Sequence, residues 1–170
     1  MRVKQHTLIN AQREDIATYL QSPEFTQALV THLGVVHQIE LQEEHREGTT
    51  LTRVMRYSAR TQDQIPSFLK KYESSAPEFV HWRQIETWDT QLLSMTYTIK
   101  AEIKDEWQKY YTTHGKLELV AAGGAQTSMH ATLDYKVNVF GLGKLIEKAA
   151  RKEVTKILAR QGEVVSAHFA

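Results

Sequence analysis

Cysteine is absent from this sequence of 170 residues, and proline occurs only three times. The lack of cysteine excludes disulfides, thiol chemistry and zinc or iron–sulfur centres held by cysteine. With only eight glycines and no low-complexity tract, nothing in the composition indicates a flexible linker. A chain of this length buries roughly 70 % of its unfolded surface, so we predict a single domain that spans residues 1–170.

A strong charge of one sign and long hydrophobic runs are also missing. The formal net charge is +1, which gives no electrostatic reason to expect a nucleic-acid partner. The apolar runs are too short to cross a bilayer, and the first residues lack the apolar core of a signal peptide. These absences lead us to expect a cytoplasmic protein.

Motifs that would indicate metal, nucleotide or catalytic chemistry are missing as well. The eight histidines do not show the His-x-x-x-His or Glu-x-x-His spacing of metal ligands on a helix. Gly141-Leu142-Gly143 is too short for a phosphate-binding loop. We therefore expect no metal and no cofactor, and we assign no catalytic residue.

What the sequence does contain is a regular succession of helix and strand patterns. Val3–Ile9 alternates as a strand, and Ala11–Leu20 has helical spacing with Asn10 as its N-cap. Ser22-Pro23 begins a second helix, which Gly34 ends. The beginning of the chain is therefore expected to form one strand followed by two short helices.

The middle of the chain is rich in β-branched and aromatic residues at period two, which is typical of strands. The expected strands are Val35–Gln42, Thr50–Ala59, Phe79–Trp88, Leu92–Ile103, Leu117–Val120 and Thr127–Val139. Glu43–Gly48 is expected to form a hairpin loop. Gln64–Tyr72 departs from the pattern and is expected to form a short helix or a long loop.

The turn Gly123-Gly124-Ala125 joins the last two strands and predicts their register. A three-residue loop there pairs Leu117 with Ala131 on the inner face and His114 with Asp134 on the outer face. A metal or acid/base site built on such histidines inside the fold would need the opposite parity. We therefore interpret them as part of a polar outer sheet face.

The last part of the chain changes to an uninterrupted helical pattern that begins near Gly141 and reaches the C-terminus. At 1.5 Å per residue this helix would be about 40 Å long. An apolar stripe at helical spacing is expected to pack on the core; its members are Leu142, Leu145, Ile146, Ala149, Ala150, Val154, Ile157, Leu158 and Val165. Lysines and arginines occupy the remaining face. A membrane-surface helix is one interpretation, and we favour a solvated face because the core needs the apolar stripe.

The strand Phe79–Trp88 leaves two alternatives open, because its even and odd positions are equally mixed. A two-residue loop to the next strand turns the even set inward, and a three-residue loop turns the odd set inward. With the even set inside, Glu86 would be a buried carboxylate between two tryptophans that could act as a general acid. With the odd set inside, Arg83 could meet a ligand carboxylate or phosphate. Alternatively, these charges lie on a solvated outer face.

The order of strand, two helices, about six strands and one long helix resembles the START-like, helix-grip superfamily (SRPBCC), with its polyketide cyclase/dehydratase and pollen-allergen types. The segments Gly115–Gly124 and Asp134–Lys148 are similar in detail to one uncharacterised bacterial branch, and Ile65–Phe68 and Ile85–Trp88 also fit it. Phe140 stands where that branch often has proline. The implied fold is α+β, a curved antiparallel sheet of about six to seven strands around one long C-terminal helix, with two short helices after the first strand.

The resemblance implies a cavity between the sheet and the terminal helix that holds lipids, sterols, polyketides or similar apolar molecules, and it assigns no catalytic residue. A curved sheet that one helix cannot fill leaves such a pocket, and methionines make its lining adaptable. The residues expected to contact the ligand are Trp82, Met95, Tyr97, Ile99, Leu117, Leu119, Met129, Leu133, Leu145 and Ala149.

Three functions remain as hypotheses. The leading one is a binding or carrier protein for a hydrophobic small molecule or lipid, with Tyr97 orienting its polar end. The second is a cyclase, dehydratase or hydrolase that uses the same pocket, with Glu86 or His81 acting together with Tyr97. The third is a protein-interaction module without a ligand, in which Trp82, Trp88 and Tyr110 would form an exposed aromatic patch.

Overall fold

The computed structural model describes residues 1–64, 70–71, 74 and 76–170. These residues form one antiparallel sheet of seven strands in the order β1-β7-β6-β5-β4-β3-β2. The strands are β1 Arg2–Ile9, β2 Gln38–Glu47, β3 Thr50–Arg60, β4 Phe79–Asp89, β5 Ser94–Ala101, β6 Tyr111–Gly123 and β7 Gln126–Val137. The helices are α1 Arg13–Leu20, α2 Pro23–Leu33, α3 Thr61–Gln64, α4 Asp105–Gln108 and α5 Gly143–His168.

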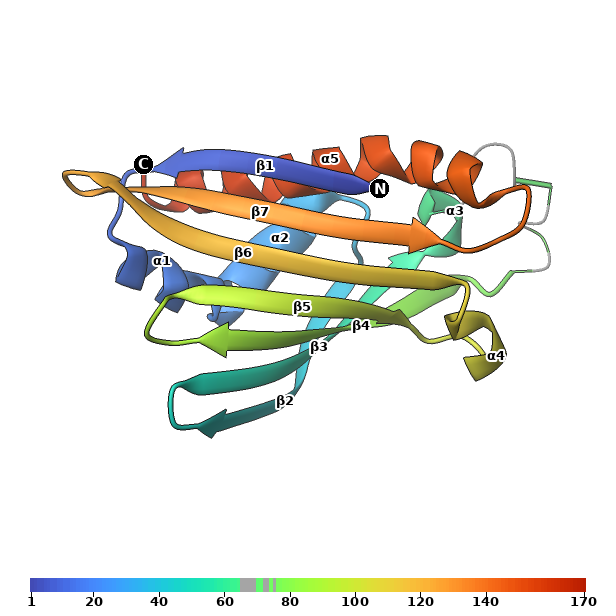
Figure 1. Ribbon diagram of the computed structural model, residues 1–170, viewed down its shortest axis with the longest axis horizontal. Coiled ribbons are helices and arrows are strands. Elements are labelled where there is room, and N and C mark those ends of the chain that lie inside the picture. The colour runs from blue at the N-terminus through green and yellow to red at the C-terminus, as the bar shows by residue number, and fades with distance from the viewer. Residues whose placement is uncertain (65–69, 72–73, 75) are drawn as a thin grey trace.

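The long helix α5 runs along one side of the curved sheet, next to β1 and β7, and α2 packs against it (Figure 1). The two short helices α1 and α2 follow β1 directly. This arrangement confirms the helix-grip architecture expected from the sequence. Most of the segment expected to be a short helix or long loop, Gln64–Tyr72, lies outside the described residues. Among the described helices, none is long and apolar enough to cross a membrane.

The ends of α2 agree with the sequence signals, whereas the start of α1 does not. The Ser22 hydroxyl accepts a hydrogen bond from the Phe25 N–H at 3.2 Å, and Gly34 ends α2 with a φ of 68°. The predicted N-cap Asn10 is wrong, because α1 begins only at Arg13. The Asn10 side chain instead accepts a hydrogen bond from the Gln126 amide at 2.7 Å, which ties the end of β1 to the start of β7.

The strand β2 begins and ends later than its sequence pattern predicts. The expected loop Glu43–Gly48 is wrong, because the strand continues to Glu47 and a two-residue turn leads into β3. Gly48 in that turn has a φ of 58°, which glycine adopts without strain. The strand is the edge of the sheet and is exposed on both faces, so polar residues at consecutive positions are compatible with it.

The register predicted for the last hairpin is confirmed. Leu117 pairs with Ala131, and His114 pairs with Asp134. The turn itself is tighter than predicted, since Gly123 pairs with Gln126 and a bulge precedes it. The bulge supplies the extra residue that keeps the predicted register despite the shorter loop.

The even set of β4 faces inward, which resolves the alternative left open by the sequence. Trp88 pairs with Met95 and Glu86 with Tyr97, and all four are buried. The connection from Asp89 to Ser94 has four residues, Thr90 to Leu93. An even number of loop residues keeps the parity that the two-residue loop would have given.

The two halves of α5 differ in burial. Leu158, Val164 and Val165 are buried in the core, whereas no residue from Lys144 to Ile157 is buried. The expected apolar stripe is therefore wrong for its first members, because Leu142 and Leu145 are exposed. The helix is longer than the core surface that it covers. Only the apolar side chains of its C-terminal half are therefore buried against the core.

Candidate functional site

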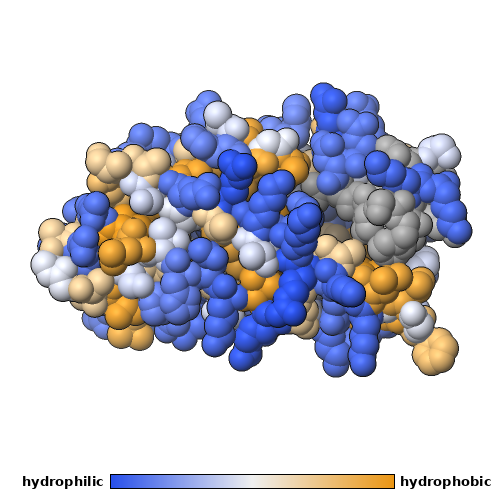
Figure 2. Space-filling view, turned by 90° about the horizontal axis from the view of Figure 1, so that it is seen from above, coloured by the Kyte–Doolittle hydropathy of each residue, from blue (hydrophilic) through white to orange (hydrophobic). Residues whose placement is uncertain are grey.

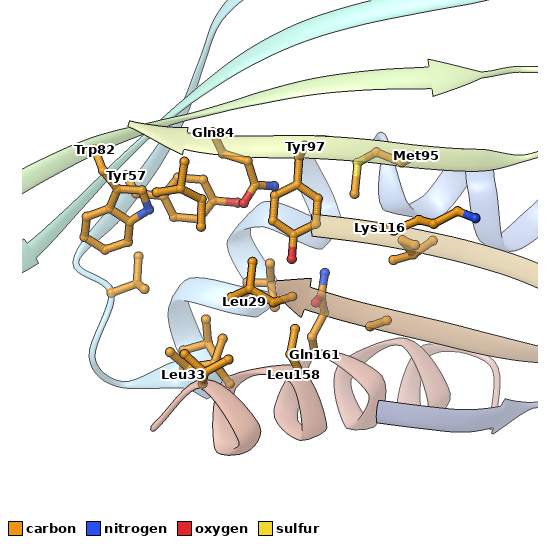
Figure 3. Close-up of a pocket in the computed structure, with 17 residues that line it drawn as sticks. Leu29, Leu33, Tyr57, Trp82, Gln84, Met95, Tyr97, Lys116, Leu158 and Gln161 are labelled. Atoms are coloured by element: carbon orange, nitrogen blue, oxygen red, sulfur yellow. The ribbon is translucent and has the colours of Figure 1, made fainter. Parts of the chain in front are cut away.

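A pocket of about 250 Å³ lies between the sheet and the helices α2 and α5, and we call it the main pocket (Figure 3). Most of its lining is apolar. The lining residues are Leu29, Leu33, Val36, Tyr57, Trp82, Gln84, Met95, Tyr97, Ile99, Lys116, Leu117, Ala131, Leu133, Val154, Ile157, Leu158 and Gln161. The lining comes mainly from α2, from strands β3 to β7 and from α5. The pocket is therefore formed by elements that are far apart in the sequence.

The structure brings together six of the ten residues expected to contact a ligand. These are Trp82, Met95, Tyr97, Ile99, Leu117 and Leu133. Leu119 and Met129 lie elsewhere in the buried core, and Leu145 and Ala149 lie on the first turns of α5, away from the lining. That any of the ten binds a ligand stays a prediction.

Apart from Tyr97, sequence reasoning missed the polar lining residues, and it also missed the contribution of α2. Gln161 interrupts the apolar row of α5, between Leu158 and Val165, and that interruption was a readable signal. Tyr57 lies on β3, and its sequence position alone does not indicate that it meets the same pocket. The end of α2 contributes Leu29 and Leu33, which the sequence showed only as one apolar helix face.

Two aromatic rings form one wall of the main pocket. Tyr57 on β3 is paired with Trp82 on β4, and their rings are stacked with centroids 5.4 Å apart and an interplanar angle of 11°. Burial, followed by the charge of Glu86, raises the pKa of Tyr57. The Tyr57 hydroxyl therefore stays protonated at neutral pH and offers a hydrogen-bond donor at an otherwise apolar wall.

Tyr97 owes its position to a glycine on the neighbouring strand. Gly115 pairs with Tyr97 across β5 and β6, and a Cβ atom at that position would clash with the Tyr97 ring. A glycine inside a strand often marks such a close approach. Burial and the charge of Glu86 raise the pKa of Tyr97 to about 12. The side chain is thus a neutral donor held in one place.

Polar atoms meet across the centre of the main pocket. Figure 3 shows the Gln161 side chain of α5 and the Tyr97 hydroxyl of β5 pointing toward one another across the pocket. In the part of the chain that the structure describes, neither the Tyr57 nor the Tyr97 hydroxyl makes a hydrogen bond. Both hydroxyls are therefore available to a molecule in the pocket.

A smaller space of about 20 Å³, the inner chamber, adjoins the main pocket and shares Tyr57, Gln84 and Gln161 with it. Its size is enough for about one water molecule. Its lining also includes Arg53, Glu86 and Trp88, so it forms the polar end of an otherwise apolar cavity.

Glu86 in the inner chamber is occupied by its protein neighbours. Its carboxylate lies 3.4 Å from Arg53 Nη1 and accepts hydrogen bonds from Gln84 at 2.9 Å and from the Trp88 indole at 3.2 Å. Arg53 Nε lies 3.2 Å from a Glu44 oxygen, an ion-pair distance without hydrogen-bond geometry. A buried guanidinium needs such paired carboxylates, so the main role of Glu86 here is to compensate Arg53.

The charges around the pocket are paired. Among the described residues, Lys116 is the only cation in the lining of the main pocket, and its ammonium lies 2.8 Å from Glu118. Arg53 in the inner chamber faces two carboxylates. Within the described residues, no three His, Asp or Glu side chains are grouped closely enough to hold a metal ion. The site can therefore bury apolar surface and donate or accept neutral hydrogen bonds.

The aromatic patch expected for an interaction module does not form. Trp88 is buried, and Trp82 lines the main pocket against Tyr57. Both side chains face inward because the even set of β4 does. This placement is a correction to the third hypothesis, because two of its three surface aromatics belong to the interior.

Several solved structures have the same fold. A START superfamily protein from Mycobacterium smegmatis matches with a TM-score of 0.63 at 13% identity, over 99% of each chain. Norcoclaurine synthase from Thalictrum flavum matches with a TM-score of 0.65 at 14% identity, over 99% of this chain and 85% of the other. The Zhui aromatase/cyclase from Streptomyces sp. R1128 matches with a TM-score of 0.62 at 14% identity, over 96% of this chain and 93% of the other.

Identities this low show a common fold and nothing more about activity. None of the curated proteins matches the sequence. One family model, described as "Protein of unknown function (DUF2505)", matches residues 5–168, which is nearly the whole chain. The chain belongs to the DUF2505 family, and its fold is the one that these solved structures share.

Proposed function

We propose that this protein binds a small, uncharged and largely apolar molecule in the main pocket and does so without chemical conversion. The observation that carries the proposal is the lining itself: apolar side chains surround two tyrosine hydroxyls that have no hydrogen-bond partner among the described residues. Apolar burial supplies roughly 25 cal/mol per Å² of surface removed from water. The hydroxyls and the two glutamine amides would orient the polar group of the bound molecule.

The size of the main pocket supports a small ligand. Pockets for drug-sized molecules have volumes of about 300–1,000 Å³, and the main pocket has about 250 Å³. A molecule of one or two rings fits this volume, whereas a lipid with two long chains does not. The stacked Tyr57 and Trp82 rings offer a flat wall against which an aromatic ring would pack.

The charge balance supports an uncharged ligand. A buried anion without a partner is strongly disfavoured. The cations of the main pocket and the inner chamber, Lys116 and Arg53, are already paired. A fatty acid or an aromatic carboxylate would therefore lack a counter-ion. A phenol, alcohol, ketone or amide needs only the hydrogen bonds that Tyr97, Tyr57 and Gln161 can make.

The enzyme hypothesis is the second candidate, because Glu86 faces inward opposite Tyr97 as that hypothesis required. However, the hydrogen bonds of the Glu86 carboxylate go to Gln84, Trp88 and Arg53. Tyr97 with a pKa of about 12 is a donor at neutral pH and a poor base. These two facts favour binding over acid/base catalysis.

A matched set of small molecules tests the proposal. Naphthol, naphthoate and naphthalene share one ring system and differ in their polar group, and each can be titrated against protein loaded with prodan, a neutral naphthalene dye of two rings. We expect naphthol to displace the dye at least about tenfold better than naphthoate, because a buried anion would be unpaired. Naphthoate binding as well as naphthol, or no displacement by any of the three, would contradict the proposal.

Two variants and one direct measurement complete the test. Leu133→Trp should fill the pocket and abolish dye binding, whereas Leu92→Trp on the exposed β4–β5 turn should not change it. Native mass spectrometry of gently purified protein, followed by denaturing extraction, would identify any molecule that travels with the chain. Turnover of a bound phenol or ketone would move the assignment to the enzyme hypothesis.

A further inference from the structure

We propose that the N-terminal end of α5 and the turn before it form a docking surface for membranes that contain anionic phospholipids. The surface consists of an apolar tip, made of Phe140, Leu142 and Leu145, and a lysine row, made of Lys144, Lys148, Lys152 and Lys156. Burial, helix geometry and charge each support it. The proposal goes beyond ligand binding and does not depend on it.

The apolar tip is exposed for a reason that helix geometry explains. Val154 lines the main pocket, and Leu145 lies nine residues before it, about two and a half turns away at 3.6 residues per turn. Leu145 therefore lies on the opposite side of α5 and is 49% exposed. Phe140 is fully exposed and Leu142 is 44% exposed. Three large apolar side chains in six residues are thus directed away from the core.

The tip lies at one end of the molecule together with other apolar surface. Figure 1 places the turn between β7 and α5 at the same end as α4, and the Asn138 N–H donates to the Tyr110 carbonyl at 2.6 Å. Trp107 of α4 is 55% exposed and packs near the Tyr110 ring. Figure 2, which looks down on α5, shows hydrophobic residues gathered at the end where α5 begins, beside strongly hydrophilic ones.

The lysine row follows the same outward side of the helix. Its members are spaced four residues apart, so they lie above one another along α5. Within the described residues, none of the four makes an ion pair, although like charges at this spacing destabilise a helix. Of the two acids in this half, Glu147 accepts a hydrogen bond from the Val137 N–H and lies near the N-terminal amine. The outward side is therefore strongly cationic in a chain of net charge +1.

The start of α5 adds a third feature of the same sign. No side chain caps the helix, and its first turn contains no acidic residue. The first N–H groups of a helix carry a partial positive charge and accept anions. Alone this would indicate no site, but here it adjoins exposed apolar residues and lysines.

Apolar side chains flanked by lysines on one helix are the pattern of an interfacial helix, whose apolar residues enter the acyl boundary while lysines meet anionic headgroups. A protein partner or a second copy of this chain would need a complementary acidic surface. An anionic bilayer supplies that complement without a shaped surface, so we favour it as the occupant.

Co-sedimentation of the full chain with vesicles tests the proposal. We expect binding to vesicles of phosphatidylcholine mixed with phosphatidylglycerol, weakening as salt is raised, and little binding to phosphatidylcholine alone. Phe140→Ser combined with Leu145→Ser should weaken binding at least about tenfold. Lys148→Gln combined with Lys152→Gln should weaken it about tenfold or more.

Matched controls separate the surface from general effects. Leu92→Ser removes a leucine at the β4–β5 turn that is more exposed than Leu145, and Lys4→Gln with Arg46→Gln removes the same charge from other elements. Both controls should leave vesicle binding unchanged, and circular dichroism should show that every variant is folded. Vesicle binding that is absent in the wild type, or is unchanged by both tip and lysine variants, overturns the proposal. Self-association abolished by Phe140→Ser, without vesicle binding, overturns it in favour of a second copy.

Discussion

The two halves of α5 are one continuous helix with opposite surroundings. In the C-terminal half, Leu158 and Val165 are buried, and Gly162 packs against Thr7 of β1. In the N-terminal half, Leu145 is exposed and the lysines have no ion-pair partner among the described residues. One amphipathic helix can therefore anchor the fold at one end and present a free surface at the other.

The pocket lies at the boundary between these halves. Val154 and Ile157, which are only partly buried, line it together with Leu158 and Gln161. A ligand would therefore contact the last turns of the exposed N-terminal half of α5 and the first turns of its buried C-terminal half. Stability, ligand binding and membrane docking should respond to different parts of the same helix.

One substitution in each half of α5 should show the largest difference between the two halves. Leu158→Ala removes a buried side chain and should lower the free energy of unfolding by about 3 kcal/mol. Leu145→Ala should change it by less than about 0.5 kcal/mol. Urea unfolding of the two variants measures both values. Equal costs would show that the exposed appearance of Leu145 does not reflect its energetic role.

Gly162 provides a second test of the anchored half. Alanine is a better helix former than glycine, yet a Cβ at this position would clash with the Thr7 side chain. We expect Gly162→Ala to destabilise the fold by about 2 kcal/mol. Thr7→Ala in the same chain should recover part of that loss, and a double-mutant cycle measures the coupling. A neutral or stabilising Gly162→Ala would mean that α5 can shift on β1.

Tyr97, which faces Gln161 at the boundary, gives the pH-dependent test. Replacing it with phenylalanine should weaken naphthol binding by about 1 kcal/mol, or roughly fivefold. In the wild type the hydroxyl donates only while protonated, and its pKa is raised to about 12. Naphthalene does not ionise, so its binding at high pH reports on the pocket alone.

The raised pKa of Tyr97 also predicts how stability depends on pH. Below the ordinary tyrosine pKa near 10, the folded protein should lose no stability through Tyr97. Above it the free energy of unfolding should fall until the pH passes about 12.

Tyr97→Phe should reduce that alkaline loss of stability, as followed by thermal unfolding at rising pH. Part of the loss should remain, because burial also raises the pKa of Tyr57. Tyr110→Phe is the matched control, because Tyr110 lies just before β6 and outside the lining of the main pocket. An identical alkaline profile in the wild type and in Tyr97→Phe would show that Tyr97 does not ionise late.

A substitution in the N-terminal half of α5 should have the smallest effect on stability. Lys148→Glu replaces two like-charge contacts, with Lys144 and Lys152, by attractive ones, and should stabilise the helix by about 0.5 kcal/mol. The same variant should weaken binding to anionic vesicles. Chemical denaturation and vesicle co-sedimentation measure the two responses. Destabilisation by more than about 1 kcal/mol would instead give the lysine a structural role.

The sequence predicted those parts of the fold that depend on local chemistry. Ser22 and Pro23 mark the start of α2, and Gly34 marks its end. The register that pairs Leu117 with Ala131 followed from a short glycine turn and from the alternation of two strands. Such features are encoded within a few residues, where backbone preference and side-chain parity leave few alternatives.

The site was only partly predictable. Met95 and Tyr97 were identified because their strand alternates regularly. Tyr57 and Gln161 were missed because they reach the pocket from distant elements, and Glu86 could be placed only once the β4–β5 turn was known. Parity along one strand says nothing about which other strand or helix faces it.

The order of elements, the family resemblance and one apolar stripe along the last helix could be read from the sequence. All members of the stripe share helical spacing, so periodicity cannot rank them. Val154, Ile157 and Leu158 line the pocket, whereas Leu142 and Leu145 are exposed. The tertiary structure made this distinction, because burial depends on where the sheet lies against the helix.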